Sequence, residues 1–433
     1  MSFTPHIENE FPAEMEVGAR VPIRELPSSK PRNWRVIHAC EHARDVLPVV
    51  EGQVAAGMRP YIVTPLGAGA AELYLAGKQS EQRRSLSLLR AWQDVRSWRK
   101  SLLECDPESS ADIVHAHTFA AGMAAVRSLS CVVYDPSACI EELALSLGQC
   151  ESGSWMGRSF RVAEQFVLSR AEAIVVHSLG MKAAVEERGA PPEGVFLIPE
   201  PVNFEEEIQP VNGDYRFAIP IGTTAYFVPK LLDDESENLS APALAVLEAF
   251  ALLIAELPES RLLIGAPTAR ATLLASHLER LRITAHASLV EEASASAAMR
   301  DADVVIATDQ IPTDIVLARQ PNEICLNGLR QGKALLAADV PRNRDASPDG
   351  RGCLWFKAGD PRDLSSRMAF LGRNADFRSA LSLAGRDFIF ATRNSTSVGR
   401  KYDEAYRYAL HRKKSGGKGP NVPGLQPILL NGF

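Results

Sequence analysis

The chain has 433 residues, of which 46% are hydrophobic and 23% are charged. This is the composition of a soluble globular protein, and the length predicts two or three domains because a domain holds about 150 residues. The net charge of −6 is opposite in sign to that of most nucleic-acid binders, so no nucleic-acid partner is expected.

Cysteine usage and the apolar runs bear on the compartment. The seven cysteines include no Cys-x-x-Cys pair and their number is odd, which favours reduced thiols over disulfides or a zinc site. The first 33 residues contain no apolar stretch of secretory-signal length. The longest apolar run, Ala241 to Leu257, is interrupted by Glu248 and Glu256 and therefore predicts a core helix. We expect a cytoplasmic protein.

Prolines punctuate residues 1–33, which predicts an extended N-terminal arm. Strands and helices then alternate, as in a doubly wound α/β domain. Apolar runs predict strands at 34–40, 60–65, 112–117, 131–136, 173–178 and 195–199, with helices at 46–57, 81–103, 159–170 and 181–188 between them.

Two segments of this half allow more than one interpretation. Gly67-Ala-Gly69 imitates a dinucleotide-binding fingerprint but lacks its third glycine, so we expect a loop there. The helix from Glu81 to Leu103 carries basic residues beside Trp92 and Trp98. That face can be solvated over an apolar stripe that packs on a sheet, which we favour, or it can lie on an anionic membrane surface.

Polar side chains lie at the ends of two of the predicted strands. His115 and His117 are two residues apart on a strand and so face the same side. Such a pair can hold a metal, but no third ligand is evident, so we expect hydrogen-bonded histidines and no metal site. Tyr134 and Asp135 close the next strand. A free tyrosine titrates at about pH 10, too high for proton exchange near neutral pH.

The stretch from Glu205 to Tyr215 combines three glutamates with Pro210 and Gly213, and it predicts a linker. After it the alternation restarts, which indicates a second doubly wound domain. A helix predicted at 323–331 begins at the end of a strand, where free N–H groups and a partial positive charge favour phosphate. Strands are predicted at 225–231, 261–265, 303–308 and 334–338, a strand and turn at 354–360, and helices at 244–257, 362–371 and 403–410.

Three motifs in these segments carry a family resemblance. The run from Asp112 to His117 corresponds to Asp-Val-Val-His-x-His, the run from Val246 to Leu253 to Leu-Leu-Glu-Ala-Phe-x-x-Leu, and Gly332-Lys333 to the start of Gly-Lys-Pro-Val-Val. Through these motifs, residues 34–410 resemble the GT-B glycosyltransferases of the retaining group 1 or family 4 type.

The resemblance implies an α/β protein of two doubly wound, Rossmann-like domains that face each other across a cleft. The implied divisions are an arm at 1–33, an acceptor-side domain at 34–204, a linker at 205–215, a nucleotide-sugar-side domain at 216–385, a helix at 386–412 that returns to the first domain, and a flexible tail at 413–433.

The resemblance also implies site residues, although the glutamate pair of the family is replaced here by Arg319 and Asn327. In such enzymes cations and helix-start amides stabilise the departing diphosphate, and carboxylates hold ribose and sugar hydroxyls. The implied donor-side residues are Lys230 as the phosphate cation, Asn322 at the helix start, Glu323 as the hydroxyl acceptor, Asn327 as its weaker substitute, and Gly265 in a turn. The implied catalytic residues on the acceptor side are Tyr134, Asp135 and His117.

Two functions from different classes stay open. The first is a glycosyltransferase that moves a sugar from a nucleotide-diphosphate donor to a saccharide, lipid or small-molecule acceptor, with retention and without a metal or bound cofactor. The second is a catalytically degenerate relative that serves as a binding or assembly subunit of a glycan-building complex, with a protein partner. Peripheral contact with the inner membrane face is open in both.

Overall fold

The computed structural model describes two α/β halves. It describes residues 34–41, 46–64, 67–70, 88–106, 110–127, 131–202, 219, 222–231, 238–291, 294–308 and 315–416. The predicted arm at 1–33, the linker at 205–215 and most of the tail at 413–433 lie outside these residues.

The first half is built on a seven-stranded sheet with the order β3-β2-β1-β4-β5-β6-β7. Its strands pair in parallel except at β3, which is antiparallel to β2. The strands are β1 (Arg35–Ala39), β2 (Arg59–Thr64), β3 (Gly67–Ala70), β4 (Ile113–Ala116), β5 (Cys131–Tyr134), β6 (Ala173–Val176) and β7 (Val195–Leu197).

The prediction of a loop at Gly67-Ala-Gly69 is wrong. These residues form the edge strand β3, in which Gly69 pairs with Ile62 and Gly67 with Thr64 of β2. The pairing satisfies backbone groups of β2 that would otherwise lie at the edge of the sheet.

Helices cover both faces of this sheet, and three of them begin at a hydroxyl cap. The side chains of Thr118, Ser154 and Ser178 each accept a hydrogen bond from the backbone N–H three residues on, which satisfies one of the free amides of a helix start. The helices are α1 (Leu47–Ala55), α3 (Leu88–Cys105), α4 (Phe119–Ala125), α5 (Ile140–Ser146), α6 (Trp155–Arg170), α7 (Leu179–Glu187) and a 3-10 turn at Pro192–Gly194.

The second half has a six-stranded sheet with the order β10-β9-β8-β11-β12-β13, and all its pairs are parallel. The strands are β8 (Ala225–Val228), β9 (Arg261–Gly265), β10 (Ala287–Val290), β11 (Val304–Ala307), β12 (Ala334–Ala338) and β13 (Cys353–Phe356). The helices are α8 (Ala241–Glu256), α9 (Ala271–Arg280), α10 (Ala295–Asp301), α11 (Ile315–Arg319), α12 (Glu323–Arg330), α13 (Pro341–Arg344), α14 (Pro361–Arg373) and α15 (Ala375–Arg393), with 3-10 turns at Thr268–Arg270 and Thr284–His286.

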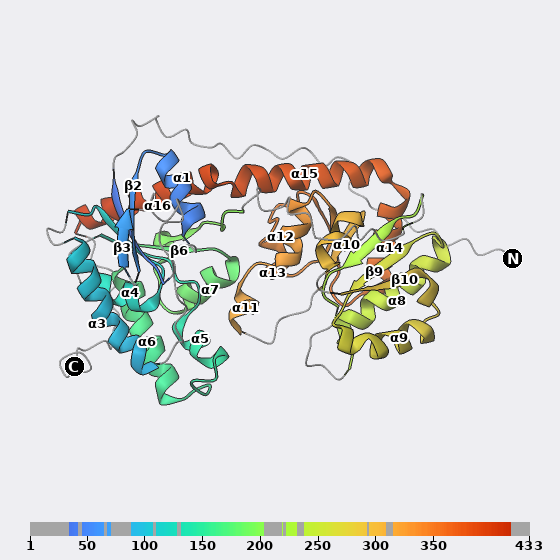
Figure 1. Ribbon diagram of the computed structural model, residues 1–433, viewed down its shortest axis with the longest axis horizontal. Coiled ribbons are helices and arrows are strands. Elements are labelled where there is room, and N and C mark those ends of the chain that lie inside the picture. Colours follow the sequence, from blue (N-terminus) through green and yellow to red (C-terminus); the bar gives the residue numbers. More distant parts are fainter. Residues whose placement is uncertain are drawn as a thin grey trace.

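The chain returns to the first half in α16 (Ser395–Lys414). The long helix α15 runs along the second half, and α16 continues from it over the first sheet (Figure 1). Where α1 and α16 cross, a Cβ on Gly52 would lie 2.1 Å from the carbonyl oxygen of Ser395, so only glycine permits the contact. Tyr402 and Tyr406 of α16 are fully buried against the sheet. The prediction of two doubly wound α/β domains is therefore confirmed.

In the described part of the chain, no helix has both the length and the apolar character that crossing a membrane requires. Trp98 of α3 is 3% exposed and packs in the core of the first half, so its ring faces the sheet. Arg96, Arg99 and Lys100 are exposed on the same helix. At Trp98 the helix therefore has the solvated face over a packed stripe that we favoured from the sequence.

Candidate functional site

Segments that follow strands of the two sheets meet between the halves. The strand order changes direction between β1 and β4 in the first sheet and between β8 and β11 in the second, and ligands of such sheets bind at these points. Ser178, just after β6, donates a hydrogen bond of 2.5 Å to the carbonyl oxygen of Arg319, at the end of α11. The two strand-end edges are thus in contact at this point.

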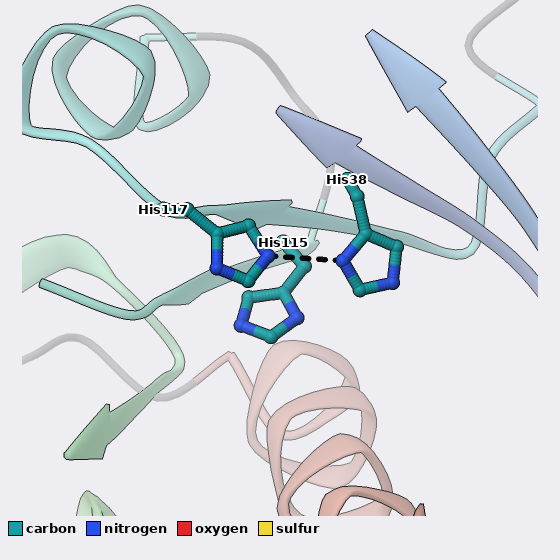
Figure 2. A group of neighbouring side chains, drawn as sticks. All are labelled: His38, His115 and His117. Carbon is teal, nitrogen blue, oxygen red and sulfur yellow. Dashed lines mark hydrogen bonds between the residues drawn. The ribbon is translucent and has the colours of Figure 1, made fainter. Parts of the chain in front are cut away.

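Three histidines meet at the edge of the first sheet. His38 of β1 is the direct neighbour of His115 of β4, and aligned residues in a sheet point to the same face. His117 lies two residues beyond His115 and so joins them. Figure 2 shows the three rings turned toward one another, with Nδ1 of His38 2.9 Å from Nε2 of His117.

Asp135 is the carboxylate at the centre of this edge and is 2% exposed. Its Oδ1 lies 3.0 Å from Nε2 of His177, and its Oδ2 accepts a hydrogen bond of 3.1 Å from the hydroxyl of Tyr402. Oδ2 is also 3.3 Å from Nε2 of His115 and 3.5 Å from Nδ1 of His117. His115 lies in β4, His117, Asp135 and His177 directly follow strands, and Tyr402 belongs to α16.

Burial and this carboxylate decide the charges at the edge. Burial alone would lower the pKa of His177, but the Asp135 carboxylate raises it to about 9, so His177 and Asp135 form an ion pair at neutral pH. Burial lowers the pKa of His38 to about 3, with a further contribution from His115. The same causes hold the pKa of His117 well below its ordinary value, so both of these rings are uncharged.

Two further helices complete the network. Nε2 of His38 is 2.8 Å from Oε1 of Gln53 in α1, and Nε2 of Gln53 donates to the hydroxyl of Tyr406 at 2.8 Å. The same hydroxyl lies 2.8 Å from Nδ1 of His115. The returning helix α16 thus holds Asp135 through the hydroxyl of Tyr402 and His115 through the hydroxyl of Tyr406.

Tyr134 points to the other face of the first sheet. Its side chain is fully buried, and a Cβ on Gly122 would come within 2.9 Å of its ring. Burial and the nearby Glu164 raise the pKa of the phenol well above its ordinary value. A substrate at the strand ends would not meet this hydroxyl, and the catalytic role assigned to Tyr134 stays a prediction that the structure gives no geometry to support.

At the edge of the second sheet, Lys230 follows β8 and Gly265 ends β9. The Lys230 side chain is exposed. Gly265 is buried, and a Cβ there would lie 1.9 Å from the carbonyl oxygen of Pro229. The glycine is therefore needed for the close approach of two backbone segments, and this approach sets the position of the turn that carries Lys230.

Groups of the second half itself cap the start of α12. The side chain of Asn322 accepts a hydrogen bond of 3.0 Å from the N–H of Ile324 and donates one of 2.7 Å to Oδ1 of Asn343. The N–H of Asn322 bonds to the carbonyl oxygen of Arg342 at 3.3 Å. Two of the amides that we expected to meet a phosphate are thus already bonded.

Polar side chains remain around this helix start. Glu323 is exposed in the first turn of α12, and half-buried Asn327 follows four residues later on the same face. Arg342 of α13 is close by: its Nε donates to the carbonyl oxygen of Gln320 at 3.1 Å. Arg342 is a second cation at this edge, which the sequence motifs did not indicate.

Arg319 links the two halves. It stands where the family resemblance places a glutamate, yet its guanidinium forms an ion pair with Glu142 of α5, with NH2 2.9 Å from Oε1. Beside it, Gln320 donates to the carbonyl oxygen of Ser137 at 2.8 Å, and the N–H of Leu179 donates to Asp345 at 2.8 Å. In Figure 1, α11 lies between the halves, next to α5 and α7.

A buried cluster of charges backs this link. Arg188 is 3% exposed and lies 2.8 Å from Glu142 and 3.6 Å from Glu164. Glu164 is fully buried, and burial raises its pKa to about 7 although Arg188 opposes the shift. The first half therefore contains a carboxyl group that changes charge near neutral pH.

Sequence reasoning found only part of this constellation. The strands predicted at 34–40 and 112–117 become neighbours in a doubly wound sheet, so His38 could have been placed beside His115 from the order of strands. Gln53, Tyr402 and Tyr406 carried no signal, because their positions depend on how α1 and α16 pack.

Comparisons with known proteins agree with this geometry. Residues 8–201 match the model of a glycosyl transferase 4-like domain. No curated protein sequence matches the chain. The fold is similar to that of a glycosyltransferase from Rickettsia africae, with 13% identity, a TM-score of 0.58, and coverage of 87% of this chain and 99% of that one.

Two further solved structures are similar over most of the chain. HepE from Anabaena, in complex with UDP, has 12% identity and a TM-score of 0.54, with 87% of this chain and 100% of that chain covered. Sucrose-phosphate synthase from Thermosynechococcus elongatus has 11% identity and a TM-score of 0.50, with 88% and 100% covered. The predicted resemblance is confirmed: the chain carries a glycosyl transferase 4-like domain and has the two-domain GT-B fold of glycosyltransferases.

Proposed function

We propose that the protein is a glycosyltransferase that takes a sugar from a nucleotide diphosphate and transfers it to a saccharide, lipid or small-molecule acceptor. The observation that carries this proposal is the meeting of two strand-end edges, one of them in a glycosyl transferase 4-like domain. The similar HepE structure holds UDP and glucose, which fits a nucleotide sugar as the donor.

The donor diphosphate would lie at the edge of the second sheet. Lys230 and Arg342 are the cations of this edge, and cations in a fixed position stabilise the charge that develops on a departing diphosphate. Glu323 and Asn327, on one face of α12, would accept hydrogen bonds from ribose or sugar hydroxyls. Because side chains supply the positive charge, we place no metal at the phosphates.

The acceptor would lie against the edge of the first sheet. His117 is the partly exposed member of the histidine group, with 15% of its side chain accessible, and Asp135 lies behind it. We infer that the exposed edge of the His117 ring contacts the acceptor while Asp135 orients the ring. The transfer would proceed with retention, as the family resemblance implies, and would take place in the cytoplasm or against the inner face of a membrane.

One observation favours the alternative, a degenerate binding or assembly subunit. Asn322 occupies an amide at the start of α12, and Arg319, in the place of a glutamate, is paired with Glu142 across the two halves. Both contacts use groups that a donor would need. In this alternative the two-domain scaffold presents a surface to a protein partner of a glycan-building complex.

A panel of nucleotides separates the two functions. Thermal unfolding would be followed with uridine, guanosine and adenosine diphosphates and their sugar forms, because a ligand that binds only the folded state raises the melting temperature. We expect a clear rise with one base. Inorganic diphosphate alone is the control for nonspecific binding of anions, and no rise with any nucleotide would favour the assembly subunit.

A further inference from the structure

The histidine group at the edge of the first sheet has the residue types and the spacing of a metal site, and it is separate from the donor edge. We propose that His38, His115 and His117 bind one divalent transition-metal ion, with zinc as the ion that best suits three imidazoles. One nitrogen from each ring lies within 4.8 Å of the other two. The inference does not depend on the proposed transfer reaction.

The distances are close to those that zinc requires. Zinc binds histidine nitrogens at about 2.0–2.1 Å in a tetrahedral arrangement, which puts two ligand nitrogens about 3.4 Å apart. Nδ1 of His38 and Nε2 of His117 are 2.9 Å apart, so these rings would separate by a fraction of an ångström. His115 packs against His117 with ring centroids 4.1 Å apart and would turn or shift toward the ion.

Each ring also has an outer partner of the kind that metal-binding histidines use. Such histidines hold their second nitrogen in a hydrogen bond with a carboxylate, carbonyl oxygen or similar group, which orients the ring. Nε2 of His38 bonds to the amide oxygen of Gln53 at 2.8 Å. Nδ1 of His117 faces Asp135, 3.5 Å away, and Nδ1 of His115 bonds to the hydroxyl of Tyr406 at 2.8 Å.

The positions of the ring protons decide which groups face each other between His38 and His117. The amide oxygen of Gln53 only accepts, so Nε2 of His38 holds the proton of that ring and Nδ1 presents a lone pair. The Asp135 carboxylate favours a proton on Nδ1 of His117, which leaves a lone pair on its Nε2 as well. In these tautomers two lone pairs lie 2.9 Å apart, an arrangement that a bound cation would stabilise.

Without a metal, Gln53, His38 and His117 can form a chain of hydrogen bonds. With the amide of Gln53 turned over, its nitrogen donates to His38, and the proton of that ring moves to Nδ1 and reaches His117. That chain needs no cation. It leaves Nε2 of His115 3.3 Å from Oδ2 of Asp135.

The surroundings suit a cation that enters from solvent. His38 and His115 are fully buried, whereas His117 keeps 15% of its side chain exposed and would form the entrance. The buried carboxylate of Asp135 lies just behind the rings and favours positive charge there. The ion would tie β1 to β4 and, through Tyr406, to the returning helix α16, and three protein ligands leave one position for water or a substrate atom.

Zinc binding to the full-length protein without an affinity tag tests the proposal. After treatment with a chelator, the protein would be titrated with zinc by calorimetry and melted with and without the ion. We expect one equivalent per chain and a rise in melting temperature. His117→Ala should weaken binding at least tenfold, since loss of even an outer partner costs about 10- to 100-fold in affinity.

The matched control is His411→Ala, which removes an exposed histidine of α16 and should leave zinc binding unchanged. Circular dichroism would confirm that His117→Ala is folded, and His117→Gln, which keeps more of the side-chain volume, replaces it if the alanine variant does not fold. The proposal fails if the wild-type protein takes up no stoichiometric zinc, or if a folded His117 variant binds zinc as tightly as the His411 variant.

Discussion

The strand ends of the two sheets occupy equivalent places in their domains but are built from different side chains. In the first sheet, His38, His115 and Asp135 are buried, His177 is partly buried, and the group is bonded internally and to α16. In the second sheet, Lys230 and Glu323 are exposed, and the helix start is capped by Asn322.

Because of this difference, we assign stability mainly to the first edge and ligand recognition mainly to the second. A buried network of charges is costly to disturb, because removal of one partner leaves another uncompensated. Exposed charges contribute little to folding, and an incoming ligand can reach them from solvent. We therefore expect substitutions at the first edge to change the free energy of unfolding and substitutions at the second edge to change binding.

The largest effect should follow Asp135→Asn. The change leaves His177 as a buried cation whose carboxylate partner, 3.0 Å away, is gone. Breaking a buried ion pair costs about 3–5 kcal/mol, so the midpoint of urea unfolding should fall strongly. Asp349→Asn, at an exposed aspartate, is the control, and equal midpoints for the two variants would show that the network contributes nothing to folding.

The next effect depends on pH and arises at Glu164. Its pKa in the folded protein is about 7, above the ordinary 4.5, so between these values the folded protein holds a proton that the unfolded chain has lost. Its contribution to the free energy of unfolding should therefore fall as pH rises from about 4.5 to 7, by up to about 3 kcal/mol.

The measurement is the unfolding free energy of Glu164→Gln and of the wild type across this pH range. The variant should lose part of the dependence, and Glu193→Gln, at an exposed glutamate of the same half, should keep it. Parallel curves for wild type and Glu164→Gln would mean that Glu164 is ionised throughout.

A smaller effect is expected for Arg319→Ala, which breaks the link between the two edges. Glu142 is 4% exposed and keeps Arg188 as a partner, so we expect a loss of about 1–2 kcal/mol and a broader distribution of domain distances in solution scattering. Arg344→Ala is the control, because its ion pair with Asp339 is exposed and lies within one half. Identical scattering by the two variants would argue against a link.

The smallest change in stability should come from Lys230→Ala. The side chain is exposed, so the free energy of unfolding should change by no more than about 0.5 kcal/mol. If the lysine meets the donor diphosphate, the same variant should lose most of the rise in melting temperature caused by nucleotides. Lys357→Ala removes an exposed lysine elsewhere in the second half and should keep that rise.

Much of the fold followed from periodicity, whereas part of the site did not. Alternating apolar runs and helices indicated two doubly wound domains, since each buried strand of a parallel sheet is a continuous apolar run. The returning helix predicted at 386–412 was not divided into α15 and α16, which the structure separates at Asn394, the residue that caps the start of α16. Tyr134 was expected at the site, but the alternation along β5 turns it to the opposite face from Asp135.

The sequence by itself determined that two α/β halves exist and which residues lie at the ends of their strands. The reason is that burial and the alternation of strands and helices follow from local hydrophobic patterns. Only the tertiary structure decided which strand ends are neighbours, that Arg319 reaches Glu142, and that Tyr402 and Tyr406 return from the end of the chain to hold Asp135 and His115. Contacts between residues hundreds of positions apart depend on strand order and helix packing, and no local pattern specifies these.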